Sequence, residues 1–219
     1  MKRVIAMFFR IKGYRKGMSA VFICFLLTGF LTGCGETFKA DCDTLYIQKN
    51  GTVISASIED FNKDYYNEEE LKNFVEERVT EYQEKHGENS VKMDNFSVED
   101  GIANLYIKYD GYENYRDFNE VTFFSGTIPQ ALAEGFDFNV QFTEIQDKAA
   151  AGTVDNRTIV DTDCKVIILN EKVDVKVDGT IRYMSSEYTT IKGEDTVSIK
   201  LPDDAGDGEE LSLVYIVYN

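Results

Sequence analysis

Three pairs of short stretches in which apolar and polar residues alternate constrain the fold of this 219-residue chain more than any other feature. The turns between the paired stretches contain Asn50-Gly51, Asp100-Gly101 and Asp178-Gly179. Period-two alternation is typical of half-buried strands, and these dipeptides accept the positive φ that tight hairpin turns need. The sequence therefore predicts three antiparallel hairpins: residues 44–48 with 52–57, 91–98 with 102–109, and 173–177 with 180–184.

One long amphipathic helix is predicted over residues 68–86. Asn67 is a favourable N-cap residue, and the three glutamates that follow it place negative charge where it suits the helix dipole. Gly87 ends the helix. The apolar stripe, which Arg78 interrupts, consists of Leu71, Phe74, Val75, Val79 and Tyr82.

Shorter elements complete the predicted pattern. Short helices are expected at residues 112–119 and 128–134, and short strands at residues 121–124 and 136–142. Residues 147–155 suit a loop, and the chain beyond them is nearly all strand, at 158–160, 164–169, 196–201 and 211–218. The sequence predicts an α+β fold in which residues 44–150 form a lobe with the hairpins and the main helix, and residues 156–219 form a β-rich lobe. One continuous domain fits the same pattern.

The N-terminus has the composition of a secretory signal. Six basic residues and no acidic ones occur in residues 1–33, and an uncharged apolar run covers residues 18–31. The run is shorter than the roughly 20 residues that a membrane-spanning helix needs. Residues 1–33 are therefore expected to direct export and not to join the folded domain.

The end of this segment, Leu31-Thr32-Gly33-Cys34, resembles the lipobox of bacterial lipoprotein precursors, and the chain is similar to small lipoproteins of clostridia-like Gram-positive bacteria that have no assigned activity. The resemblance implies a diacylglyceryl group on Cys34, cleavage before it, and anchoring at the extracytoplasmic face of the cell membrane. An ordinary signal peptide that happens to be cut before a cysteine is the alternative. Residues 34–43 form a short tether of at most about 35 Å.

The mature chain is strongly acidic. Loss of six basic residues with the signal leaves 17 basic and 39 acidic side chains, a net charge of −22. This charge argues against nucleic acid as a partner and against peripheral binding to anionic lipid. Cys42 and Cys164 are the cysteines that remain besides Cys34, and an exported compartment permits a disulfide between them. Two free, buried cysteines are the alternative.

Motifs for catalysis or for a resident cofactor are lacking. The mature chain has one histidine, His86, which is explained as a cation near a helix C-terminus. The weak Ca²⁺ candidates are Asp203, Asp204 and Asp207; an EF-hand loop there fails because Val214 stands where a bidentate glutamate is required. A solvated turn explains them more simply.

A cluster of aromatic residues presents the same choice between a function and the core. The members could line a groove for a glycan or peptide, but their helical and strand spacing is more typical of the core. They are Tyr112, Tyr115, Phe118, Phe123 and Phe124.

The function expected from these features is that of a non-catalytic binding or interaction module of the cell envelope. Its partner, an envelope protein or a cell-wall ligand, is not identified by the sequence. A solute-binding lipoprotein of a transporter is the first alternative. An envelope hydrolase that uses two carboxylates is the second, although no carboxylate pair stands out in so acidic a chain.

Metabolic labelling with a palmitate analogue tests the anchor. The protein should incorporate the label, Cys34→Ala should lose it because the acylated sulfur is gone, and Cys42→Ala should keep it. Undiminished labelling of Cys34→Ala would rule out lipid on this cysteine.

Overall fold

The computed structural model describes residues 38–202 and 210–219, which form two β-sheets and four helices and so confirm the α+β class. The seven-stranded sheet has the order β11 (Thr189–Ile191), β12 (Thr196–Ile199), β9 (Asp174–Val177), β1 (Thr44–Ile47), β2 (Val53–Asp60), β4 (Ile102–Tyr109) and β3 (Val91–Glu99). The six-stranded sheet has the order β5 (Phe123–Thr127), β8 (Lys165–Leu169), β13 (Val214–Tyr218), β10 (Ile181–Ser185), β6 (Phe142–Gln146) and β7 (Ala149–Val154). Within the described residues, the pairing of β1 with β9 is the one parallel pair.

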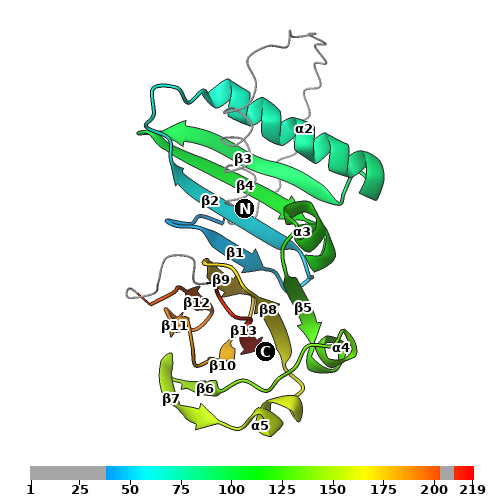
Figure 1. Ribbon diagram of the computed structural model, residues 1–219, viewed down its shortest axis with the longest axis vertical. Coiled ribbons are helices and arrows are strands. Elements are labelled where there is room, and N and C mark those ends of the chain that lie inside the picture. The colour runs from blue at the N-terminus through cyan, green and yellow to red at the C-terminus, as the bar shows by residue number, and fades with distance from the viewer. Residues whose placement is uncertain (1–37, 203–209) are drawn as a thin grey trace.

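The helices lie at the ends and on the flank of this assembly (Figure 1). They are α2 (Glu68–His86), α3 (Tyr112–Asn119), α4 (Ile128–Ala133) and α5 (Asn156–Val160). α2 packs against β3, α3 lies against β4 and β5, and α4 lies against β5 and β8. Among the residues that the structure describes, no helix is both long enough and apolar enough to cross a membrane.

The predicted long helix is confirmed at both ends. The Asn67 side chain accepts a hydrogen bond from the Glu70 backbone N–H at 3.0 Å, and Gly87 ends the helix with a φ of 98°. Leu71, Val75 and Val79 are buried. The interruption of the apolar stripe at Arg78 is accommodated because its guanidinium lies 5.6 Å from the centre of the Phe118 ring, where a cation–π contact forms.

The first two predicted hairpins are confirmed, with different turns. In the β1–β2 turn Gly51 has a positive φ of 90°, whereas in the β3–β4 turn both Asp100 and Gly101 do, at 52° and 73°. The second combination matches a type I′ turn, whose twist suits the flanking strands.

The third predicted hairpin is wrong. β9 belongs to the seven-stranded sheet and β10 to the six-stranded sheet, so Asp178-Gly179 joins two sheets. Asn219 lies against this connection, and its backbone forms two hydrogen bonds with the backbone of Thr180, of 2.9 and 3.1 Å. Alternation and an Asp-Gly pair describe two strands and a bend, but they do not specify which neighbour each strand pairs with.

Several short elements also differ from the prediction. The expected loop at 147–155 contains the edge strand β7, which pairs with β6 through a turn in which Asp147 and Lys148 have φ values of 48° and 66°. Residues 158–160 belong to helix α5 because Asp155 caps it, accepting from the Arg157 N–H at 2.8 Å. The expected strand at 136–142 is irregular until Phe142, and the strand β11 was not predicted.

The two sheets share an apolar core, and the chain passes back and forth between them. One buried cluster includes Leu45 and Leu105 of the seven-stranded sheet together with Ile167 and Ile216 of the six-stranded sheet. A second cluster, which includes Phe142 and Tyr215, lies in the six-stranded sheet beneath α4 and α5. Each sheet takes strands from before and after residues 150–156, so this part of the chain does not divide one sheet from the other.

Replacement of Gly179 tests the connection between the sheets. A Cβ at Gly179 would overlap the backbone carbonyl of Asn219, whereas the nearest atom to a Cβ at Gly193 is 3.9 Å away. Gly179→Ala should lower the free energy of unfolding by about 1–3 kcal/mol through overpacking, and Gly193→Ala should change it little. Equal stability of the two variants in urea denaturation would contradict this packing.

Candidate functional site

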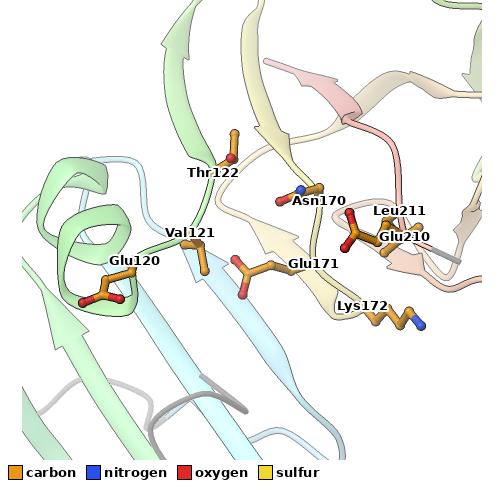
Figure 2. A pocket seen from close by; sticks show the side chains of 8 residues that line it. All are labelled: Glu120, Val121, Thr122, Asn170, Glu171, Lys172, Glu210 and Leu211. Carbon is orange, nitrogen blue, oxygen red and sulfur yellow. The ribbon is translucent and has the colours of Figure 1, made fainter. Parts of the chain in front are cut away.

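An open pocket of about 560 Å³ lies where the chain passes between the two sheets. One wall comes from the α3–β5 connection, another from the β8–β9 connection, and the third from the segment that leads into β13 (Figure 2). Its lining residues are Glu120, Val121, Thr122, Asn170, Glu171, Lys172, Glu210 and Leu211. Ligand sites favour such junctions because side chains from separate elements converge there.

Two carboxylates point into this junction pocket. In Figure 2 the Glu171 side chain extends toward Val121, and the Glu210 carboxylate lies toward Asn170. Glu120 and Lys172 extend away from the space between them. The inner part of the pocket is therefore negative, although a lysine belongs to its rim.

A hydrogen bond to a buried tyrosine orients Glu171. The Tyr115 hydroxyl donates to Glu171 Oε1 at 2.9 Å, and the Tyr115 side chain is only 1% exposed. Burial, and then the nearby Glu171 charge, raise the pKa of Tyr115 well above its usual value. The hydroxyl therefore remains protonated and stays a donor to the carboxylate.

Aromatic packing and the end of α3 fix Tyr115 itself. Its ring makes edge contacts with Tyr109 and Phe123, with centroids 5.2 and 4.7 Å apart. The buried Asn119 side chain donates to the Tyr115 carbonyl at 2.8 Å and to the Tyr109 hydroxyl at 3.2 Å. The tyrosine that donates to Glu171 is therefore held in place by packing and hydrogen bonds within the core.

The aromatic cluster named from the sequence is core and does not line a groove. Tyr115, Phe118 and Phe123 are buried in the cluster between the sheets, and Phe124 is buried in the second cluster. Tyr112 is half-buried, and its hydroxyl donates to Glu134 Oε1 at 2.8 Å. Of the five, Tyr115 alone reaches the junction pocket, through its bond to Glu171.

Cys42 and Cys164 are free thiols, and the structure does not contain the candidate disulfide between them. Cys42 precedes β1 in the seven-stranded sheet and donates to Asp174 Oδ2 at 3.3 Å, while Cys164 immediately precedes β8 of the other sheet. Lys192 Nζ lies 2.6 Å from the same Asp174 oxygen. Partial burial, followed by the hydrogen bond and charge of Asp174, raises the pKa of Cys42, so this thiol is a poor nucleophile.

The other candidates from the sequence fall in three places. Cys34 and the Ca²⁺ candidates Asp203, Asp204 and Asp207 lie outside the described residues. His86 ends α2 and stacks on Tyr82 with ring centroids 4.1 Å apart. Within residues 38–202 and 210–219, no three His, Cys, Asp or Glu side chains are grouped so that they could hold a metal ion.

Glu171 and Glu210 were not recognisable from the sequence. Both lie outside regular elements, where no periodic pattern marks which way a side chain points. Among 39 acidic residues, two glutamates that are far apart in the chain carry no distinguishing signal. Only the path of the chain between the sheets brings them to one pocket.

No protein-family model matches this chain, and the searches of curated proteins and of solved structures also find no match.

Thiol alkylation tests the state and environment of the cysteines. In the mature acylated protein, iodoacetamide should modify both Cys42 and Cys164 without reductant, because neither is bonded. Asp174→Asn should accelerate alkylation of Cys42 at pH 8 by about twofold or more, since loss of the adjacent charge lowers the thiol pKa and increases the thiolate fraction. Asp195→Asn serves as the control. Labelling only after reduction would instead support the disulfide.

Proposed function

We propose that this protein is a non-catalytic binding module of the cell envelope, anchored at the extracytoplasmic face of the membrane by lipid on Cys34. It binds a positively charged group of its partner in the junction pocket. The observation that carries the proposal is that the carboxylates of Glu171 and Glu210 both line one open pocket (Figure 2). The lipobox supports the anchor.

The chemistry of the pocket suits an ammonium or guanidinium group. Carboxylates form their strongest hydrogen bonds with charged donors, and a carboxylate held in place loses little freedom when the partner arrives. The Tyr115 hydroxyl provides that restraint for Glu171. The net charge of −22 on the mature chain also draws cationic partners toward the domain.

The interface between the sheets favours an interaction module over a solute receptor. A receptor that closes on a small solute needs a cleft between its lobes that is lined by converging polar groups. Here the space between the sheets holds an apolar cluster that includes Leu45, Ile47, Ile167 and Ile216. The junction pocket lies at the margin of this filled interface, where the partner can remain outside the fold.

A pair of charge-matched variants tests the pocket. Glu171→Gln with Glu210→Gln removes two charges from the pocket, and Glu84→Gln with Glu88→Gln removes two charges near the end of α2. With acylated full-length protein in detergent micelles, the affinity for pentalysine should fall at least about tenfold in the pocket variant, because two charged hydrogen bonds are lost. It should fall less than about twofold in the control.

The same variants apply to the native partner. Wild type and the control should retain the same envelope component after crosslinking in intact cells, and the pocket variant should lose it. Equal affinity for pentalysine in both variants would contradict a role for the pocket. A rise in melting temperature with a small amine, without any retained envelope component, would favour the solute receptor.

A further inference from the structure

A second pocket, of about 300 Å³, is lined by the residues that come directly after Glu210 and Leu211 in the segment that leads into β13. β13 pairs with β8 on one side and with β10 on the other. The junction pocket takes lining residues from the end of the β8 side, and the second pocket takes them from the end of β10, so the segment separates the two. We call the second one the β10 pocket. Its lining residues are Asn139, Val140, Gln141, Ser185, Glu187, Tyr188, Ser212 and Leu213.

The lining of the β10 pocket is mostly polar but carries only one charged residue, Glu187. Two carboxamide residues, Asn139 and Gln141, belong to it together with two serines and a tyrosine, and no lysine or arginine does. Carboxamides and hydroxyls can each both donate and accept hydrogen bonds. A ligand group with the same double capacity, such as a sugar hydroxyl, therefore finds a partner at each of these residues.

Several polar side chains of this lining are available to a ligand. Asn139, Gln141, Glu187 and Ser212 are exposed. Within residues 38–202 and 210–219, their side chains take part in no hydrogen bond or ion pair with another residue. Such a group gives up only its contacts with water when it bonds to a ligand, so binding breaks no hydrogen bond of the fold.

Hydrogen bonds between the loops fix the walls of the pocket. The Ser186 N–H donates to the Gln141 carbonyl at 2.9 Å, and the hydroxyls of Ser186 and Thr143 lie 2.8 Å apart. The buried Ser185 hydroxyl accepts from the Tyr215 N–H at 2.8 Å. The end of β10 is thereby joined both to the α4–β6 connection and to β13. A pocket that is formed in advance loses little conformational freedom on binding.

The turn after β10 has a backbone conformation that is rare for an aromatic residue. Tyr188 has a φ of 64°, in the left-handed region that few residues with bulky side chains adopt. Its carbonyl accepts from the Lys200 N–H at 2.9 Å, and the Thr189 hydroxyl donates to the Ser185 carbonyl. These bonds hold the strained turn in place. Strained backbone that its surroundings maintain is concentrated at binding sites, which supports a ligand in this pocket.

The apolar residues of the pocket are anchored in the core. Val140 and Leu213 pack against the cluster that includes Phe142 and Tyr215, and Tyr188 packs against the cluster between the sheets. Ligand sites combine apolar lining with a few polar groups that fix orientation, and the volume of this pocket is at the small end of their range. A single sugar unit suits both properties, because it presents C–H faces as well as hydroxyls.

We propose that the β10 pocket binds one unit of a neutral saccharide. Asn139, Gln141 and Glu187 form hydrogen bonds with the sugar hydroxyls, and Val140 and Leu213 contact the C–H face of the ring. This site is additional to the proposed cation site in the junction pocket. It requires no positive charge on its ligand, and the segment that leads into β13 separates it from the junction pocket.

Titration of the full-length protein with neutral oligosaccharides tests the site. The protein is held in micelles of a detergent without a sugar headgroup, and the Kd values for tetra-N-acetylchitotetraose and maltotetraose are measured by NMR. At least one of the two should bind, and Asn139→Ala with Gln141→Ala should weaken that binding at least about fivefold because neutral hydrogen bonds are lost. Asn73→Ala with Asn89→Ala, which removes two exposed carboxamides on and after α2, should weaken it less than about twofold.

Further measurements separate this site from a loss of fold and from the junction pocket. Glu187→Gln keeps the volume of its side chain and should also weaken saccharide binding at least about twofold, since a charged acceptor becomes neutral. The carboxamide variant should keep its affinity for pentalysine, and Glu171→Gln with Glu210→Gln should keep the affinity for the saccharide. Binding of neither tetrasaccharide, or equal binding by the two carboxamide variants, overturns the saccharide site and leaves the cation site standing.

Discussion

The parallel pairing of β1 with β9 is the constraint on which the rest of the structure depends. It places Cys42 beside Asp174, 132 residues further along the chain. It also joins the strands β9, β12 and β11 to the strands β1, β2, β4 and β3 in one sheet. Such a contact forms only after a long loop has closed, and its entropic cost is offset by burying Leu45 and Ile47 against the second sheet. The apolar surface between the sheets therefore stabilises both sheets together.

The connections between the sheets also form the junction pocket. The chain leaves the seven-stranded sheet between α3 and β5 and returns between β8 and β9, and the junction pocket forms where these two passages meet. Backbone at such passages is irregular, so its side chains are free of strand alternation. Glu171 takes its direction instead from a hydroxyl of the buried core, that of Tyr115.

Local sequence patterns correctly predicted the elements that are held together by contacts between residues close in the chain. The helix between the caps Asn67 and Gly87 and the hairpins that turn at Gly51 and Gly101 are each formed by residues close together in the chain. A few capping or turn residues are therefore enough to predict each of them. The pair at Asp178-Gly179 carries the same local pattern and yet joins different sheets, in which β9 pairs with β1 and β12, and β10 pairs with β13 and β6. The pocket glutamates lie beyond such prediction, since the pocket joins residues that are distant in sequence.

The sequence by itself determined the α+β class, the long helix, two hairpins and the expectation of export and lipid attachment at Cys34, because each of these depends on a short, contiguous run of residues. Only the tertiary structure decided which strands lie side by side and which glutamates share a pocket. Strand partners are chosen by burial of apolar surface across the whole chain, and that choice is not encoded in any one segment.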